Sequence, residues 1–239
     1  MPEPSTTPAA HAWAIPEREY ARHEARRGRR FAYETLDPRT TALVTIDMVG
    51  FFVAESVRCQ AIVAPINAVA EALRAAGGTV AWVLPTVEPP SPWAIGFYGE
   101  AVAATYAASG GEGTRAERLW AGLDTAREDL WAEKSASSAF FPGRSPLPAL
   151  LDARAIETVL IAGTVTNVCC EASARDAATL GYRTIVLADA NAGVNDASHN
   201  ATLTTIYRSY GDVRPVADVL RMIAADTPDT PDMPTVSGA

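Results

Sequence analysis

The stretch Gly163-Thr-Val-Thr-Asn-Val-Cys169-Cys170 decides the fold, because an extended pattern changes into a helical one within it. The apolar run Thr-Val-Leu-Ile-Ala at residues 158–162 precedes it and is typical of a buried strand. A cysteine at the start of the following helix meets free N–H groups and the positive end of the helix dipole, which stabilise a thiolate or an oxyanion. The same position can also hold a small buried thiol without a chemical role.

The alternation of strand and helix extends outward from this junction over most of the chain. Strands are expected at residues 41–47, 80–84, 130–134, 158–162 and 184–188, with a short edge strand at 212–214. Helices are expected at residues 62–76, 147–153, 168–180, 198–210 and 215–224, and residues 86–128 are less regular. Near-continuous apolar strands between helices indicate a parallel sheet that is covered on both faces. We therefore expect an α/β fold: a three-layer α/β/α sandwich around a mostly parallel, six-stranded, Rossmann-like sheet.

Length and composition indicate one substantial domain. The chain has 239 residues, of which 48% are hydrophobic. We expect one core domain over residues 37–225, preceded by a tail and arm at 1–36 and followed by a disordered tail at 226–239. No run of about 18 apolar residues is present, so we expect no transmembrane helix and no membrane partner.

Charge and cysteine content restrict the partners and the compartment. The net charge of −8 disfavours nucleic acid as a partner. The arginine-rich stretch at residues 18–30 is interleaved with glutamates, which indicates a solvated helix or a subunit contact. Three cysteines, two of them adjacent, do not form a disulfide framework, so we expect a reduced, cytoplasmic protein.

Three polar residues follow or end predicted strands. Asp47 ends the first strand, Lys134 ends the third, and Cys169 follows the fourth. Because the carboxyl ends of parallel strands meet at one edge of a sheet, these side chains should converge. An Asp can take a thiol proton and return it to a leaving group, and a Lys beside both favours the carboxylate and the thiolate. The N–H groups of Thr166 and Cys169 are suited to hold an oxyanion. Taken singly, each residue also has a structural interpretation: a turn cap, a solvated edge lysine or a buried thiol.

Helical spacing separates the two adjacent cysteines. Cys170 falls in a stripe of small residues with Ala174, Ala177 and Gly181, which suits close packing on the sheet. Cys169 is turned about 100° from that stripe. Cys169 is therefore the candidate nucleophile and Cys170 a packing residue.

From about Thr41 to Ile223 the sequence resembles the isochorismatase-like cysteine hydrolases, in their amidohydrolase branch. The resemblance is carried by the strand that ends at Asp47, by Glu133-Lys134-Ser-Ala-Ser-Ser-Ala-Phe140-Phe, and most specifically by residues 162–177. It implies a catalytic triad of Asp47, Lys134 and Cys169 and a non-proline cis peptide between Val165 and Thr166. It also implies a homo-oligomer, a dimer or tetramer, to which residues 13–30 could contribute an exchanged arm.

The resemblance also indicates a class of substrate and bears on the expected cofactors. It implies hydrolysis of a C–N bond in a small non-peptide amide, such as a carbamoyl compound or a cyclic amide, through a thioester. Nicotinamidases of the family carry a histidine-bearing metal site after the second strand, whereas this chain has no His between His23 and His199. We therefore expect no metal ion and no other cofactor, and His199 is interpreted as a helix-start residue. Six aromatic residues are candidates for the substrate pocket, although they could equally be ordinary core: Phe51, Trp93, Phe97, Tyr98, Phe140 and Phe141.

Two other functions remain open at this point. An isochorismatase-type hydrolase would cleave a vinyl ether by acid catalysis from the Asp and would not need the cysteine. A binding or assembly protein could keep the same fold without catalysis.

Overall fold

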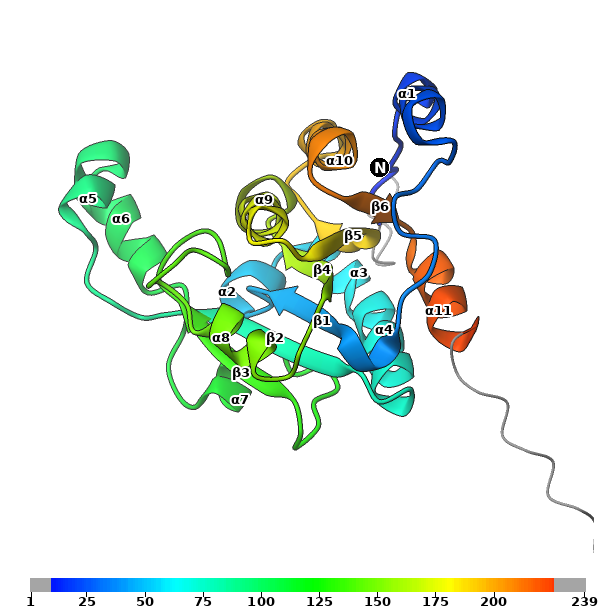
Figure 1. Cartoon of the computed structure of the whole chain (residues 1–239). Coiled ribbons are helices and arrows are strands. Elements are labelled where there is room, and N and C mark those ends of the chain that lie inside the picture. Colours follow the sequence, from blue (N-terminus) through cyan, green and yellow to red (C-terminus); the bar gives the residue numbers. More distant parts are fainter. Residues whose placement is uncertain (1–9, 226–239) are drawn as a thin grey trace, which may run out of the picture.

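The computed structural model describes residues 10–225 and contains one six-stranded sheet (Figure 1). The spatial order of the strands is β3-β2-β1-β4-β5-β6, and every neighbouring pair is parallel. The strand bounds are β1 (Thr41–Ile46), β2 (Thr79–Pro85), β3 (Leu130–Lys134), β4 (Thr158–Thr164), β5 (Arg183–Ala192) and β6 (Asp212–Arg214). The order reverses between β1 and β4, so the carboxyl ends of these two strands form the switch point of the sheet.

Helices cover both faces of the sheet, as the predicted three-layer sandwich requires. On one face lie α4 (Val63–Ala75) and α11 (Val216–Ala225), and on the other lie α8 (Leu147–Asp152), α9 (Glu171–Thr179) and α10 (Asp196–Ser209). Successive strand residues point to opposite faces. Leu43 thus joins the α4 core and Val44 the α9 core, and both are fully buried. The α/β expectation is confirmed.

Eight further helical elements complete the described part of the chain. They are α1 (Glu17–Arg27), η1 (Pro38–Thr40), α2 (Gly50–Val53), α3 (Val57–Ala61), α5 (Pro92–Tyr98), α6 (Glu100–Ala107), α7 (Arg115–Arg118) and the π-helical turn η2 (Thr166–Cys170). Among the described helices none is long and apolar enough to cross a membrane.

The segment before β1 packs on its own chain. The ring of Tyr20 on α1 meets the ring of Tyr207 on α10 edge to face, with centroids 5.0 Å apart. Ile15, His23 and Leu36 are buried. The arginine-rich helix expected here is present as α1, and its inner side is occupied by the same subunit. The first nine residues and the expected tail at 226–239 lie outside the described part.

Residues 86–128 contain more helix than the sequence pattern indicated. Here α5 and α6 form a pair that stands away from the sandwich, on the left in Figure 1. Pro92 begins α5, and Gly99, with φ 81°, separates it from α6. Elements of seven and eight residues with exposed apolar side chains give no clear buried stripe, so periodicity could not reveal them.

Candidate active site

Asp47 is the first residue past β1, where the backbone turns sharply. Its φ is 56°, in the left-handed region that Asp tolerates better than most residues, and its N–H still donates to Val83 O of β2 at 2.9 Å. Its carbonyl then accepts from the Val49 N–H at 2.9 Å, which closes the turn. The whole residue is 1% exposed. A carboxylate is therefore held at the switch point under the end of the sheet.

Lys134 reaches this carboxylate from two strands away. It ends β3 in register with Pro85 of β2, so about 10 Å of sheet separates its backbone from β1. Its long stem bridges that gap, and Nζ lies 2.9 Å from Asp47 Oδ2. Nζ also donates to Ala136 O at 3.1 Å. Lys134 is 3% exposed, so the ion pair is almost free of solvent screening.

Gly163 allows β4 to come close enough to complete the site. It pairs with Ile46 of β1 and has φ 117°. A Cβ at this position would lie 2.1 Å from Ile46 O, so no larger residue fits. Close approach of the β4 and β1 backbones beside Asp47 therefore requires a glycine at position 163.

The cis peptide that follows corrects one prediction. It joins Thr164 and Val165, one bond earlier than the expected Val165–Thr166 bond. Thr166 is already the first residue of the turn η2, in which Val165 O accepts from the Val168 N–H at 3.0 Å. The cis bond therefore falls where the strand ends, ahead of the helical residues.

The turn η2 presents the two cysteines differently. Cys169 is partly exposed, and Lys134 Nζ lies 3.5 Å from its Sγ. Cys170 is 2% exposed and packs with Ala174 and Ala177. All three cysteines, including the buried Cys59, are free thiols. The division into a reachable Cys169 and a packed Cys170 is confirmed as geometry.

Electrostatics restrict the site to one negative charge. Burial raises the pKa of Asp47, against the opposing effect of Lys134. Burial and the Asp47 carboxylate raise the pKa of the Cys169 thiol to about 12, while Lys134 works in the opposite sense. Burial alone would lower the pKa of Lys134, but the two neighbouring acids outweigh it and raise it. A permanent cation thus faces two acids that compete for a single proton.

Asp47 is placed to take that proton. Its Oδ1 is buried and accepts no well-formed hydrogen bond within residues 10–225, although the carboxylate and the Cys169 thiol are close enough to interact. Transfer from Sγ to the carboxylate moves the negative charge within the site and leaves its total unchanged. The arrangement can therefore generate a thiolate only as the carboxylate becomes neutral.

Thr166 has a partner that sequence reasoning missed. Its Oγ1 lies 2.9 Å from Nδ1 of His199, and both residues are fully buried. His199 lies in the first turn of α10, as expected, but its ring points at the turn that carries Cys169. The available signal was the position of His199 at the start of the helix expected at residues 198–210.

The six candidate pocket aromatics differ widely in exposure. Phe140 is fully buried in the core, with its ring 5.6 Å from that of Tyr182, so its placement as a pocket wall is wrong. Trp93, Phe97 and Tyr98 pack on one another on α5, with Trp93 67% and Phe97 69% exposed. Phe51 and Phe141 are about half exposed.

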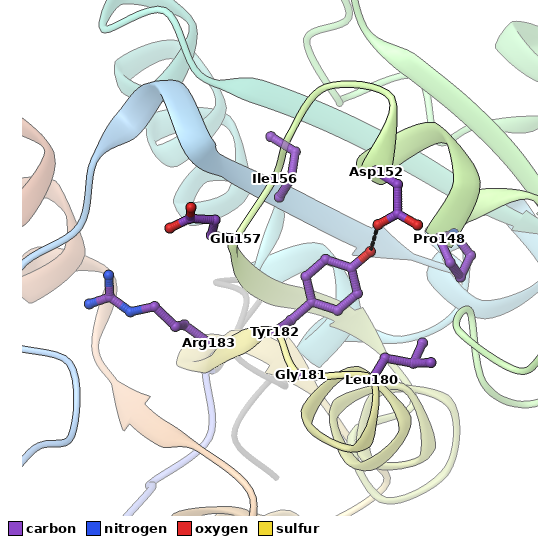
Figure 2. Close-up of a pocket in the computed structure, with 8 residues that line it drawn as sticks. All are labelled: Pro148, Asp152, Ile156, Glu157, Leu180, Gly181, Tyr182 and Arg183. Carbon is purple, nitrogen blue, oxygen red and sulfur yellow. Dashed lines mark hydrogen bonds between the residues drawn. The ribbon is translucent and has the colours of Figure 1, made fainter.

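A distinct hollow of about 420 Å³ opens at the other edge of the sheet (Figure 2). It is lined by Ile156 and Glu157 before β4 and by Tyr182 and Arg183 at the start of β5, and Tyr182 donates to Asp152 at 2.9 Å. These are the amino ends of the strands. The hollow therefore lies across the sheet from Cys169 and cannot hold a molecule that reacts there.

Metal-binding side chains do not gather in the described part of the chain. No group of three or more His, Cys, Asp or Glu residues in residues 10–225 is placed to hold one ion.

The chain belongs to the isochorismatase domain family, whose family model matches residues 41–218. The match covers all six strands and all three residues of the Asp-Lys-Cys cluster.

Solved structures support the same placement. A cysteine hydrolase from Pseudomonas syringae pv. phaseolicola superposes with a TM-score of 0.69 at 27% identity, over 82% of this chain and 97% of that one. N-carbamoylsarcosine amidase from Thermoplasma acidophilum gives a TM-score of 0.60 at 27% identity, over 74% of this chain and 96% of that one.

Curated relatives match over shorter stretches. Maleamate amidohydrolase from Pseudomonas putida is 38% identical over 90 residues, which is 38% of this chain and 41% of the relative. Ureidoacrylate amidohydrolase from Agrobacterium fabrum is 33% identical over 101 residues, 42% of this chain and 43% of the relative. The alignments thus span less than half the length of either protein.

Proposed function

We propose that this protein is a cysteine hydrolase that cleaves the C–N bond of a small non-peptide amide through a thioester. The observation that carries the proposal is the Cys169 thiol beside the buried Asp47–Lys134 ion pair at the switch point of the sheet. Each of the three groups has a task in acyl transfer, and the fold brings them together from three separate strands.

In the first step the thiol attacks the carbonyl carbon. Asp47 accepts the thiol proton as the S–C bond forms, so the charge moves from the carboxylate through sulfur to the carbonyl oxygen. The N–H groups of Thr166 and Cys169 hold this oxyanion. Lys134 remains protonated throughout and compensates the one negative charge of the site, whichever atom carries it.

In the second step the amine leaves and water enters. Asp47 returns its proton to the departing nitrogen as the C–N bond breaks, which leaves an acyl thioester on Cys169. Asp47, again a carboxylate, takes a proton from water as the water oxygen attacks the thioester. The C–S bond then breaks and Asp47 returns the proton to Sγ, which restores the thiol and releases the carboxylic acid; ammonia or an amine is the other product.

The relatives suggest the substrate class. Maleamate amidohydrolase, ureidoacrylate amidohydrolase and N-carbamoylsarcosine amidase are named for small acyclic molecules that contain an amide or carbamoyl group. We propose a substrate of this kind. Metal independence is part of the proposal, since residues 86–93 after β2 supply no histidine.

The alternatives explain less of the site. Vinyl-ether hydrolysis by acid catalysis uses Asp47 alone and gives no task to a thiol 3.5 Å from a buried lysine. A binding protein without catalysis has no need of a buried ion pair whose carboxylate interacts with that thiol. Amide hydrolysis employs all three residues.

The decisive experiment is intact-protein mass spectrometry after exposure to maleamate, ureidoacrylate and N-carbamoylsarcosine. An acyl adduct that maps to Cys169 by peptide fragmentation, together with ammonia release, is expected for at least one compound. Turnover of a vinyl ether by a Cys169→Ala variant, with no amide hydrolysed by the native protein, would refute the proposal.

We also propose a homo-oligomer, a dimer or tetramer, and a cytoplasmic location. The family resemblance supports the first, and light scattering on the purified full chain tests it. A catalytic thiol must stay reduced, which favours the second. Fractionation with an antibody to the full chain measures the location.

A further inference from the structure

The chain just before α1 is fastened to the start of α10. Asn200 Nδ2 donates to Ala12 O at 3.0 Å, and Ala14 N–H donates to Asn200 Oδ1 at 2.9 Å. His11 adds a contact from its Nδ1 to Asp196 Oδ1 at 2.6 Å. This segment lies outside the matched family region.

His11 uses both of its ring nitrogens. Nδ1 lies 2.6 Å from Asp196 Oδ1, and Nε2 lies against the Gly193 backbone, 2.9 Å from its N and 3.2 Å from its O. Gly193 in turn lies against Thr166, because a Cβ at Gly193 would be 3.5 Å from Thr166 Oγ1. His11 thus fixes a backbone segment that contacts the turn η2.

A second series of contacts leads from His11 through His199 to Thr166. The His11 and His199 rings stack with centroids 4.2 Å apart and planes 11° from parallel. Burial, reinforced by His11, lowers the pKa of His199 to about 4, so its ring is neutral near pH 7. His199 Nδ1 then lies 2.9 Å from Thr166 Oγ1, three residues before Cys169. A continuous series of contacts joins the N-terminal segment to the reactive turn.

We propose that His11 is a positioning residue for the Cys169 turn, acting through His199, Gly193 and Thr166. It touches neither the triad nor the place where a carbonyl would react. Its task is to hold Thr166, and with it the N–H groups and the sulfur of η2, in fixed relation to Lys134. The inference rests on the proposed function only in taking Cys169 as the reacting thiol.

The first test measures the alkylation rate of Cys169 by iodoacetamide, with peptide fragmentation to distinguish Cys169 from Cys170. His11→Ala is compared with Asn200→Ala, which removes the other fastening of the segment but leaves His11, His199 and Thr166 in place. A loosened turn withdraws sulfur from Lys134, so His11→Ala should react about fivefold more slowly at each pH from about 7 to 9. Asn200→Ala should stay within about twofold of the native rate.

The pH profile distinguishes positioning from general loosening. Asp196, Arg58 and His199 face His11 and are unchanged in both variants, so a displaced profile in His11→Ala alone reports on His11. Equal profiles for native protein and His11→Ala would overturn the inference. An equal displacement in Asn200→Ala would overturn it too, because docking of the whole segment would then be responsible.

Hydrogen exchange provides a readout that does not depend on thiol chemistry. Amides in a peptide that covers residues 164–170 should exchange several-fold faster in His11→Ala than in Asn200→Ala. Unchanged exchange would overturn the inference. A native Cys169 that resists iodoacetamide would count against the proposed function, and the exchange result would then decide on His11 by itself.

Discussion

The triad and the α5–α6 pair both follow carboxyl ends of strands, yet they are held in opposite ways. Asp47 and Lys134 are 1% and 3% exposed and joined by an ion pair, whereas Trp93 and Phe97 on α5 are more than two-thirds exposed. Figure 1 shows the pair standing clear of the sandwich that carries the triad. Asp47 and Lys134 are therefore fixed by buried strand ends, while the aromatic side chains of α5 are largely exposed to solvent.

If strand ends hold the site in this way, replacing the proposed nucleophile should have the largest effect on turnover. Cys169→Ala should lower amide turnover by about 10⁴-fold or more, because covalent catalysis is lost while the fold keeps its core. Cys170→Ala is the matched control. It removes a buried sulfur that packs with Ala174 and Ala177 and should leave turnover within about tenfold of the native rate. Ammonia release on a compound that labels Cys169 is the measurement. Comparable losses in the two variants would contradict the assignment.

The ion pair should give the next largest effect. Asp47→Asn and Lys134→Met should each reduce turnover by about 10²- to 10⁴-fold. Lys134→Met also leaves a buried carboxylate unpaired, at a cost to the free energy of unfolding of about 3–5 kcal/mol. The double variant removes both charges, so it should regain much of that stability without regaining activity. Urea unfolding and ammonia release on all three variants test this, and a double variant no more stable than Lys134→Met would count against it.

Titration of His199 should make the free energy of unfolding depend on pH. Its pKa is 6.5 in the unfolded chain and about 4 when buried, so only the unfolded state takes up a proton in that interval. The free energy of unfolding should therefore fall as the pH drops from about 6.5 to about 4, by roughly 3 kcal/mol in total. His199→Asn lacks this titration. Urea unfolding at several pH values should show the native curve falling more steeply, and parallel curves would disprove the expectation.

Sequence reasoning placed Asp47, Lys134 and Cys169 together because each ends or follows a strand, and the carboxyl ends of strands in a parallel sheet share an edge. It also separated the two cysteines, because helical phase fixes which side chain faces the sheet. Both inferences depend only on local periodicity and one topological rule. The sequence pattern of the strands is therefore enough to predict most of the fold and the positions of Asp47, Lys134 and Cys169.

Other features depend on contacts that periodicity does not encode. The cis peptide was placed one bond late because the residue pattern does not report the rotation of a peptide bond. Phe140 was assigned to a pocket, although its neighbour Phe141 is the exposed member of the pair. The stacking of His11 on His199 joins residues 188 positions apart, and no local signal connects them.

The smallest effects should come from the aromatic side chains of α5. Trp93→Ala and Phe97→Ala each remove one stacked, exposed ring, so the free energy of unfolding should fall by only about 0.5–1.5 kcal/mol. Phe140→Ala, a buried aromatic of the same size as Phe97, should cost about 3–5 kcal/mol. Urea unfolding of the three variants makes this comparison directly.

The same α5 variants test whether this helix contacts substrate. If it does, Trp93→Ala should raise KM a few-fold for an amide with an aromatic substituent and leave kcat unchanged, because only ground-state binding is lost. A small acyclic amide too short to reach α5 should show no change in either constant. A drop in kcat for both amides would mean that α5 helps to position Asp47, Lys134 and Cys169. The site and the α5–α6 pair would then not be independent parts of the molecule.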